Sequence, residues 1–174
     1  MASGTFSHLK ALVVEDNVHM RTLLKSLLKA LDLREIYEAT DGDEGFDELH
    51  ATRPDFVLSD LNMSPVNGLD FTRRVRTDPG SPCPYIPIIM VTGHTERKYI
   101  EAARDAGVTE VLAKPITPHN LFTRIAEIIE RPRPFVRASG FFGPDRRRRE
   151  DMTYTGPRRR TDDGFDTSQR VEIA

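Results

Sequence analysis

The stretch Leu9-Lys10-Ala11-Leu12-Val13-Val14-Glu15-Asp16 decides the fold of this chain. Leu9–Val14 is a short apolar run with β-branched residues, which predicts a buried parallel strand. The run ends at two carboxylates, and leucines then recur at the spacing of an amphipathic helix, at positions 24, 27, 28 and 31. The sequence up to residue 130 repeats this alternation of apolar run and helical pattern.

Four further strands are predicted at residues 36–39, 56–59, 88–91 and 111–113. Helices are predicted at 41–51 with Asp41 as N-cap, at 69–76, at 95–106 before Gly107, and from Pro118 to just before Pro132. Five strand–helix units in a row predict an α/β fold, a doubly wound five-stranded parallel sheet with helices on both faces. Such sheets bind ligands beyond the carboxyl ends of their strands.

The chemically informative polar residues all fall at that edge: Glu15, Asp16, Asp60, Thr92 and Lys114. Three neighbouring carboxylates repel one another unless a cation or shifted pKa values relieve them, and hard oxygen ligands of this kind suit Mg²⁺. Magnesium and an ammonium group together would neutralise a phosphoryl group, to which a hydroxyl could hydrogen-bond. Asp60 is then the predicted nucleophile, forming an aspartyl phosphate. A cis peptide bond before Pro115 would aim Lys114 inward.

This pattern resembles the receiver domain of two-component response regulators, the CheY-like family, over residues 8–130. The matching motifs are Val-Val-Glu-Asp-Asn at 13–17, Leu-Ser-Asp-Leu-Asn-Met at 58–63, Gly68, Met-Val-Thr-Gly at 90–93 and Ala-Lys-Pro-Ile at 113–116. The resemblance implies a flavodoxin-like sheet in the order 2-1-3-4-5 with five helices. It also implies a phosphoacceptor for signalling rather than a turnover enzyme, although such domains catalyse their own phosphorylation and dephosphorylation.

The resemblance further assigns roles to single residues. It implies that a histidine kinase or phosphotransfer protein phosphorylates Asp60 and that Thr92 and Lys114 contact the phosphoryl oxygens. The implied ligands of Mg²⁺ are Glu15, Asp16, Asp60 and the carbonyl of Asn62. The chain departs from the family pattern in three places: Val111 replaces the usual switch aromatic, Ser64 shifts a proline to position 65, and Asn67 stands where aspartate is common.

Composition predicts the setting and the boundary of this domain. A single cysteine, Cys83, excludes an internal disulfide and fits a reducing compartment. No apolar run approaches the ~20 residues of a membrane helix, and the first residues lack the pattern of a signal peptide, so we expect a cytoplasmic protein without membrane insertion.

Residues 1–130 hold 14 basic and 20 acidic side chains, whereas residues 131–174 hold 11 arginines, no lysine and 7 acids. A receiver at 8–130 is therefore predicted to precede an irregular tail at 131–174, disordered or draped on the receiver, because its apolar residues are sparse.

The tail carries two related arginine clusters. Gly143-Pro144 precedes the first cluster, and Gly156-Pro157, 13 residues on, precedes the second. Arginine without lysine indicates planar, bidentate recognition, and alternate side chains of an extended strand could hold phosphates on one face and stack on bases on the other. Arginine reads guanine through O6 and N7, and a tyrosine adds a stacking surface. Cyclic di-GMP, with two guanines and two phosphates, fits this pattern, and the candidate contacts are Arg146, Arg147, Arg148, Arg149, Tyr154, Arg158, Arg159 and Arg160.

Receiver and tail together resemble the CheY-like (Cle) proteins of alphaproteobacteria, stand-alone receivers whose arginine-rich extension binds cyclic di-GMP. That resemblance implies a downstream protein target at the flagellar motor or the attachment machinery. Two alternatives stay open. The chain could be a phosphotransfer intermediate or adaptor whose tail is a flexible spacer, or the tail could bind nucleic acid. A surplus of four positive charges and the lack of a helix-turn-helix pattern make DNA the weaker prediction.

Overall fold

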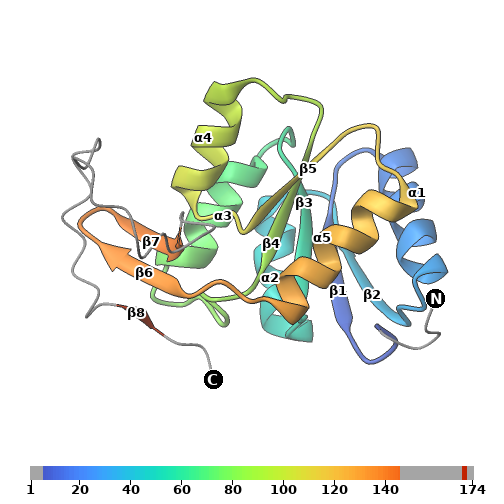
Figure 1. The fold of residues 1–174 in the computed structure, drawn as a ribbon, viewed down its shortest axis with the longest axis horizontal. Coiled ribbons are helices and arrows are strands. Elements are labelled where there is room, and N and C mark those ends of the chain that lie inside the picture. The colour runs from blue at the N-terminus through green and yellow to red at the C-terminus, as the bar shows by residue number, and fades with distance from the viewer. Residues whose placement is uncertain (1–5, 146–169, 172–174) are drawn as a thin grey trace, which may run out of the picture.

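The computed structural model describes residues 6–145 and the pair 170–171 (Figure 1). A five-stranded parallel sheet forms its centre, in the order β2-β1-β3-β4-β5. The strands are β1 (Lys10–Val14), β2 (Glu35–Ala39), β3 (Phe56–Asp60), β4 (Ile88–Thr92) and β5 (Glu110–Ala113). Their bounds lie within one residue of the predicted ones, which confirms the doubly wound, flavodoxin-like sheet.

Five helices cover the two faces of this sheet (Figure 1). They are α1 (Val18–Ala30), α2 (Gly42–Thr52), α3 (Gly68–Thr77), α4 (Arg97–Ala106) and α5 (Pro118–Glu130). Leucines and isoleucines of α1 and α5 pack on one face, against Ala11, Val13 and Phe56, while α2, α3 and α4 cover the other face. Among the helices of the described ranges, none is long and apolar enough to cross a membrane.

Side-chain caps fix where most of these helices begin. The carboxylate of Asp41 accepts hydrogen bonds from two backbone N–H groups of the first turn of α2, as predicted. Asn17 and Asn67 cap α1 and α3 in the same way, and Thr117 caps α5 by accepting one hydrogen bond, from the N–H of Asn120. The N-cap of α4, Glu96, makes no such bond, and the helix begins two residues later than predicted.

The prediction of an irregular tail from residue 131 is wrong for residues 135–144, which form a β-hairpin. Its strands are β6 (Phe135–Ala138) and β7 (Phe141–Pro144), joined by Ser139-Gly140. Gly140 adopts a φ of 78°, the left-handed conformation that glycine favours in tight turns. On the other edge of β6, the two residues of β8 (Arg170–Val171) pair antiparallel with it.

Three aromatic rings hold the hairpin against the receiver. Phe135 and Phe142 are buried, and each ring centroid lies 5.2 Å from that of Tyr85, in the proline-rich loop before β4. Beneath them, the guanidinium carbon of Arg76 lies 5.0 Å from the centre of the Phe135 ring. Burial lowers the pKa of Arg76 to about 9, so the group is still a cation at neutral pH. The hairpin therefore shares its core with the C-terminal part of α3.

We expect Phe135→Ala to destabilise the whole receiver, because the ring covers Arg76 and Tyr85 rather than filling a separate core. The expected loss is about 3 kcal/mol, the scale of a Phe→Ala change in a core. Urea unfolding followed by far-UV circular dichroism measures it. Val136→Ala, on the same strand at a half-buried position, is the control and should cost less. An unchanged unfolding midpoint for Phe135→Ala would mean that the hairpin is an independent appendage.

Candidate functional site

The parallel register brings four of the predicted site residues to one edge of the sheet. Asp60 ends β3 opposite Val91, and Thr92 ends β4 opposite Ala113. Glu15 directly follows β1, and Lys114 directly follows β5, where its N–H donates to the carbonyl of Thr92 at 2.8 Å. Strand ends at a common level thus gather residues up to 99 positions apart in the sequence.

Asp60 and Lys114 form the central ion pair of the site. The Lys114 Nζ lies 2.7 Å from Asp60 Oδ1. The other carboxylate oxygen, Asp60 Oδ2, accepts a hydrogen bond of 2.9 Å from the N–H of Asn62. The Asp60 side chain is 7% exposed and that of Lys114 27% exposed, so solvent weakens this attraction less than it would on an open surface. The Lys114–Pro115 peptide bond is cis.

Glu15 is a buried carboxylate that is only partly satisfied. Its Oε1 accepts a hydrogen bond of 3.1 Å from the N–H of Asn17. Its Oε2 is buried without a hydrogen-bond donor and lies 3.7 Å from Lys114 Nζ. Burial in the first place, and the charge of Asp60 in the second, raise the pKa of Glu15 above its ordinary value. The site therefore carries more negative charge than its own donors neutralise.

The neighbourhood of this carboxylate fits a divalent cation. Asp16 and Asn62 are exposed beside it, and Asp16 contributes to the raised pKa of Glu15. Within residues 6–145, no three carboxylate, imidazole or thiol groups are already gathered in metal-binding geometry. In the structure, the Lys114 ammonium group takes the central position between Glu15 and Asp60. A buried carboxylate oxygen without a hydrogen-bond partner is nevertheless the type of ligand that Mg²⁺ binds.

The hydroxyl of Thr92 lies at the end of the neighbouring strand. The residue is 3% exposed, and its Oγ1 accepts a hydrogen bond of 2.9 Å from the N–H of His94. The imidazole of His94 stacks on Tyr99 of α4, with ring centroids 4.5 Å apart. Val111, at the position of the expected switch aromatic, is half-buried on β5 and packs near Tyr99 in the cluster beneath α4.

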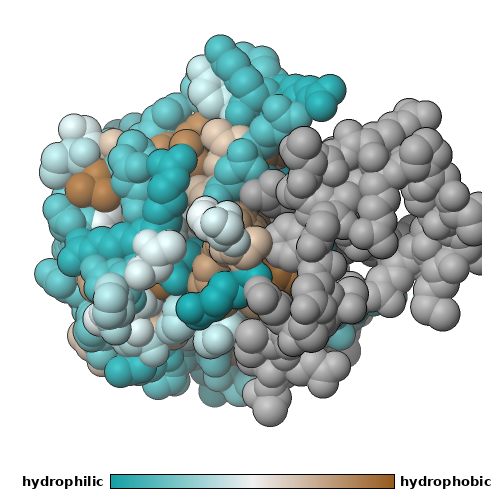
Figure 2. All heavy atoms as spheres, turned by 90° about the vertical axis from the view of Figure 1, so that its left-hand side faces the viewer, coloured by the Kyte–Doolittle hydropathy of each residue, from teal (hydrophilic) through white to brown (hydrophobic). Residues whose placement is uncertain are grey.

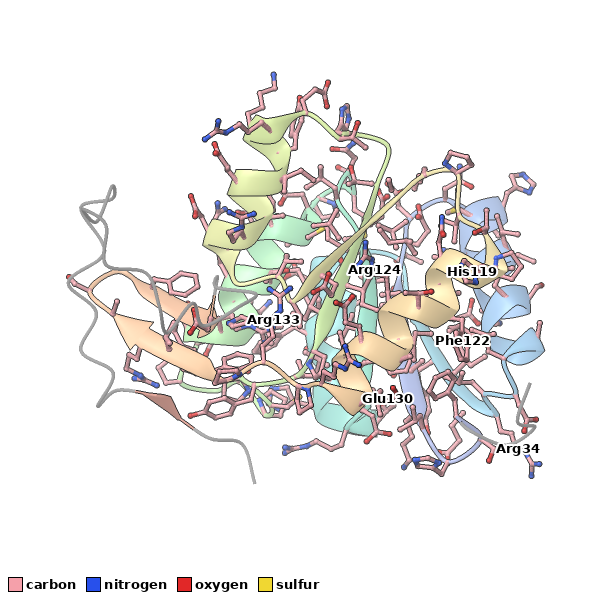
Figure 3. All side chains as sticks on the ribbon, viewed as in Figure 1. Arg34, His119, Phe122, Arg124, Glu130 and Arg133 are labelled. Carbon is pink, nitrogen blue, oxygen red and sulfur yellow. The ribbon has the colours of Figure 1, made fainter. Side chains whose placement is uncertain are left out.

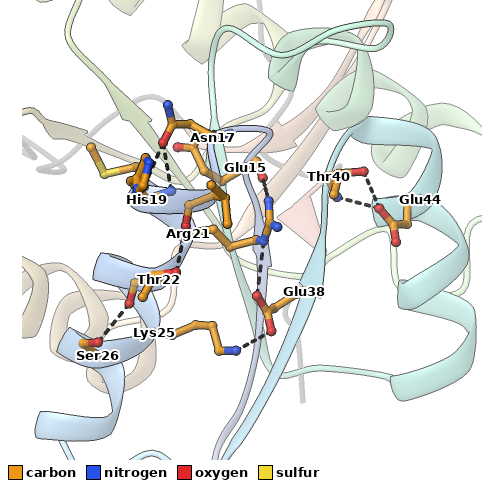
Figure 4. A network of polar contacts seen from close by, with 12 residues as sticks. Glu15, Asn17, His19, Arg21, Thr22, Lys25, Ser26, Glu38, Thr40 and Glu44 are labelled. Carbon is orange, nitrogen blue, oxygen red and sulfur yellow. Dashed lines mark hydrogen bonds and ion pairs between the residues drawn. The ribbon is translucent and has the colours of Figure 1, made fainter.

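Sequence reasoning missed a polar network that steadies the loop after β1 (Figure 4). Arg21 of α1 donates from Nη1 to the carbonyl oxygen of Glu15 at 2.6 Å and from Nε to Glu38 of β2 at 3.2 Å. Lys25, one helical turn later, also pairs with Glu38. The i, i+4 spacing of Arg21 and Lys25 places both cations on one face of α1 and was the available signal. Their acidic partner, however, lies on a strand, β2, and not on the same helix.

Gly68 is required by the close approach of α3 to the site. A β-carbon at this position would overlap the carbonyl oxygen of Asp60 and come within 3.0 Å of Ser59 Oγ. The Gly68 N–H donates to the carbonyl of Leu61 at 3.1 Å. The glycine therefore fixes the backbone that carries Asp60. The arginines and Tyr154 of the predicted ligand-binding tail lie outside the described residues.

Comparison with known proteins agrees with this geometry. Residues 11–126 match the family model of the response regulator receiver domain. The chemotaxis protein CheY of Pseudomonas aeruginosa is 37% identical over 123 residues, which cover 71% of this chain and 98% of that protein. CheY-3 of Vibrio cholerae is 33% identical over 124 residues, covering 71% and 94%. The chain belongs to the response regulator receiver family.

Solved structures give the same result. CheY4 of Vibrio cholerae superposes with a TM-score of 0.64 at 28% identity, covering 70% of this chain and 98% of that one. The receiver domain of the sensor histidine kinase PA1611 of Pseudomonas aeruginosa, with magnesium coordinated in its active-site cleft, gives 0.60 at 28% identity, covering 68% and 94%. Receiver domains are phosphoacceptors that interact with histidine kinases or phosphotransfer proteins. The family model ends at residue 126, before the hairpin.

We expect Glu15→Gln to stabilise the metal-free protein, because it removes a buried charge that lacks a donor. The melting temperature should rise by about 2–4 °C, which corresponds to roughly 1 kcal/mol in a chain of this size. The stabilisation that Mg²⁺ gives the wild type by mass action should be lost. Calorimetry with and without Mg²⁺ measures both effects. The exposed Asp47→Asn is the control, and a variant that still gains stability from Mg²⁺ would exclude Glu15 as a ligand.

We expect Gly68→Ala to destabilise the protein by about 1–3 kcal/mol, because the added methyl group meets backbone that cannot move aside. Gly93→Ala is the matched control, since a β-carbon there has no neighbour within 4 Å. Chemical denaturation of the two variants measures the difference. Equal stabilities would contradict the close approach of α3 to Asp60.

Proposed function

We propose that this chain is a response regulator whose Asp60 accepts a phosphoryl group from a histidine kinase or phosphotransfer protein and which signals through protein contacts. The observation that carries the proposal is the Lys114 ammonium group, 2.7 Å from Asp60 and 3.7 Å from the buried Glu15. A fixed cation beside a nearly buried aspartate stabilises negative charge that is added to that aspartate. Membership of the receiver family supports the same role.

The proposed reaction is an in-line phosphoryl transfer. One carboxylate oxygen of Asp60 forms a bond to phosphorus, while the bond from phosphorus to the donor's imidazole nitrogen breaks and its electron pair stays with that nitrogen. The Lys114 ammonium group is proposed to pair with the Asp60 carboxylate before the transfer and with a phosphoryl oxygen after it. The Thr92 hydroxyl, oriented by the N–H of His94, is proposed to hydrogen-bond to another. Attack of water on the same phosphorus returns Asp60 and inorganic phosphate.

Glu15, Asp16, Asp60 and the carbonyl of Asn62 are the proposed ligands of Mg²⁺. Support comes from the buried Glu15 oxygen without a donor and from the raised pKa of that carboxyl. When bound, the ion would supply charge neutralisation for the phosphoryl oxygens. The carboxylates of this chain bind and orient, whereas Asp60 alone reacts.

We also propose that the segment after the hairpin binds cyclic di-GMP through Arg146–Arg149, Arg158–Arg160 and Tyr154. The support is chemical: guanidinium groups pair with phosphates and read guanine, and the arginine clusters contain no lysine. The first cluster begins two residues after Pro144, the last residue of β7. The flagellar motor or attachment machinery is the proposed destination of the signal.

Incubation with a small phosphodonor such as phosphoramidate, with Mg²⁺, should add one phosphoryl group to the wild type. Asp60→Asn should abolish the addition, because the amide is not a nucleophile under these conditions, and Lys114→Met should slow it by removing the cation. Intact-mass spectrometry measures the product. Asp47→Asn, an exposed acid outside the site, is the control. Undiminished labelling of Asp60→Asn would overturn the assignment of the phosphoacceptor.

Isothermal titration of cyclic di-GMP into the 174-residue chain should give micromolar binding. Replacement of Arg146–Arg149 by glutamine should abolish it by removing four guanidinium groups. No binding by the wild type at hundreds of micromolar ligand would leave the segment as a spacer. Binding to RNA or DNA with a steep salt dependence would favour the nucleic-acid alternative instead.

A further inference from the structure

The loop between β1 and α1 is fixed through the backbone of Glu15 as well as through its side chain. The Glu15 N–H donates to the carbonyl of Ala39, the last residue of β2, at 3.0 Å. The Glu15 carbonyl accepts a hydrogen bond of 2.6 Å from Arg21 Nη1. The Glu15 carboxylate accepts from the N–H of Asn17 at 3.1 Å, and the Asn17 side chain in turn caps α1. Strand β2, helix α1 and the loop itself thus hold Glu15 from three directions.

The bond from Arg21 also bears on the next residue, Asp16. The carbonyl of Glu15 and the N–H of Asp16 belong to one peptide unit, and a peptide unit is planar. A donor that fixes the direction of this carbonyl therefore fixes the plane from which the backbone of Asp16 continues. Asp16 is exposed, so the direction of its carboxylate depends on that backbone rather than on packing.

The guanidinium group of Arg21 is itself held in place (Figure 4). Its Nε donates to Glu38 Oε2 on β2 at 3.2 Å, while Nη1 reaches the Glu15 carbonyl. Two N–H groups of one planar fork are used at once, which a lysine, with a single nitrogen on a flexible chain, does not reproduce. Lys25 pairs with the other carboxylate oxygen of Glu38, one helical turn further from the loop.

We propose that Arg21 is a positioning residue for Mg²⁺ at the Asp60 site. By holding the carbonyl of Glu15, it keeps the carboxylates of Glu15 and Asp16 in the arrangement that binds the ion. A loop that is ordered before the ion arrives loses less conformational freedom on binding, and affinity rises accordingly. The inference rests on the proposed ligands of Mg²⁺, and it adds a residue that touches neither the ion nor Asp60.

Arg21 affects a bound cation in two opposite ways. Its positive charge repels Mg²⁺, whereas its hydrogen bond to the loop orders the ligands. Hydrogen bonding from Lys25 in the first place, and from Arg21 after it, lowers the pKa of Glu38. Glu38 is therefore ionised at neutral pH and offsets much of the charge of Arg21, so we expect the ordering effect to be the larger one. Loss of charge alone would tighten Mg²⁺ binding, and loss of order would weaken it.

The test compares Arg21→Lys with Lys25→Gln in the 174-residue chain, by titration with Mg²⁺ followed in amide ¹H–¹⁵N spectra. Arg21→Lys keeps the charge but loses the fork. It should raise the dissociation constant of Mg²⁺ about tenfold, the scale for a residue that orients a metal ligand. Lys25→Gln removes a charge beside the same Glu38 and should not weaken binding. Equal affinities of wild type and Arg21→Lys, or equal weakening by both variants, would overturn the proposal.

Two variants far from the loop separate positioning from a general loss of stability. Arg124→Gln weakens the pairing of Glu110 at the opposite edge of the sheet, and Figure 3 shows Arg124 on α5 and Arg133, the second partner of Glu110, on the linker that follows. Phe135→Ala lies in the hairpin, on the face seen in Figure 2, whereas α1 lies on the other side of the molecule in Figure 1. Both should lower the urea midpoint and leave Mg²⁺ affinity unchanged. A tenfold loss of Mg²⁺ affinity in either would overturn the role of Arg21.

The rate of phosphorylation by phosphoramidate gives a second readout. The Mg²⁺ concentration for the half-maximal rate should rise about tenfold in Arg21→Lys, whereas the rate at saturating Mg²⁺ should match the wild type, because Arg21 touches no reacting atom. A lower plateau with an unchanged Mg²⁺ requirement would overturn the proposal. Wild-type protein that shows no Mg²⁺-dependent shifts would overturn the proposed metal ligands together with this inference. Mg²⁺ binding that Arg21→Lys leaves unchanged overturns the inference alone.

Discussion

The Lys114 ammonium group, held between two carboxylates, is the interaction on which the rest of the site depends. Without it, Glu15 and Asp60 would face each other across a nearly buried space, and one of them would have to take up a proton. The contact needs β3 and β5 to end at the same level on either side of β4. The register that pairs Asp60 with Val91 and Thr92 with Ala113 meets that need.

Strand β5 links this edge of the sheet to the opposite one. Its C-terminal end leads into Lys114, whereas its first residue, Glu110, pairs with arginines of α5 and of the linker to the hairpin. The hairpin in turn packs on Gly107, just before β5. An event at Asp60 and an event at the base of the hairpin therefore act on the two ends of a single four-residue strand.

The positions of the strands and the gathering of Asp60 and Lys114 could be predicted because both follow from apolar runs that end in polar residues, whereas the order of the strands was implied by the family resemblance. Glu110 could not, since an acid at the start of a strand is expected in solvent, and its two arginine partners lie 14 and 23 residues away. The hairpin was missed because Phe135 and Phe142 find their core against Tyr85, not within the tail. Ser139-Gly140 between two apolar stretches was the local signal for it. Arg76 is buried on the inner face of α3, where its guanidinium group bonds the carbonyls of Gly107 and Pro84 and lies under the Phe135 ring of the hairpin.

The most direct test of the account is the amide ¹H–¹⁵N spectrum of the protein before and after addition of Mg²⁺ and beryllofluoride, which mimics a phosphoryl group on aspartate. The account predicts shifts at Leu61, Thr92 and Lys114, continuing along β5 to Glu110, and their loss in Asp60→Asn. An unchanged wild-type spectrum, or the same shifts in the variant, would contradict the claim that Asp60 and Lys114 form a phosphoacceptor site.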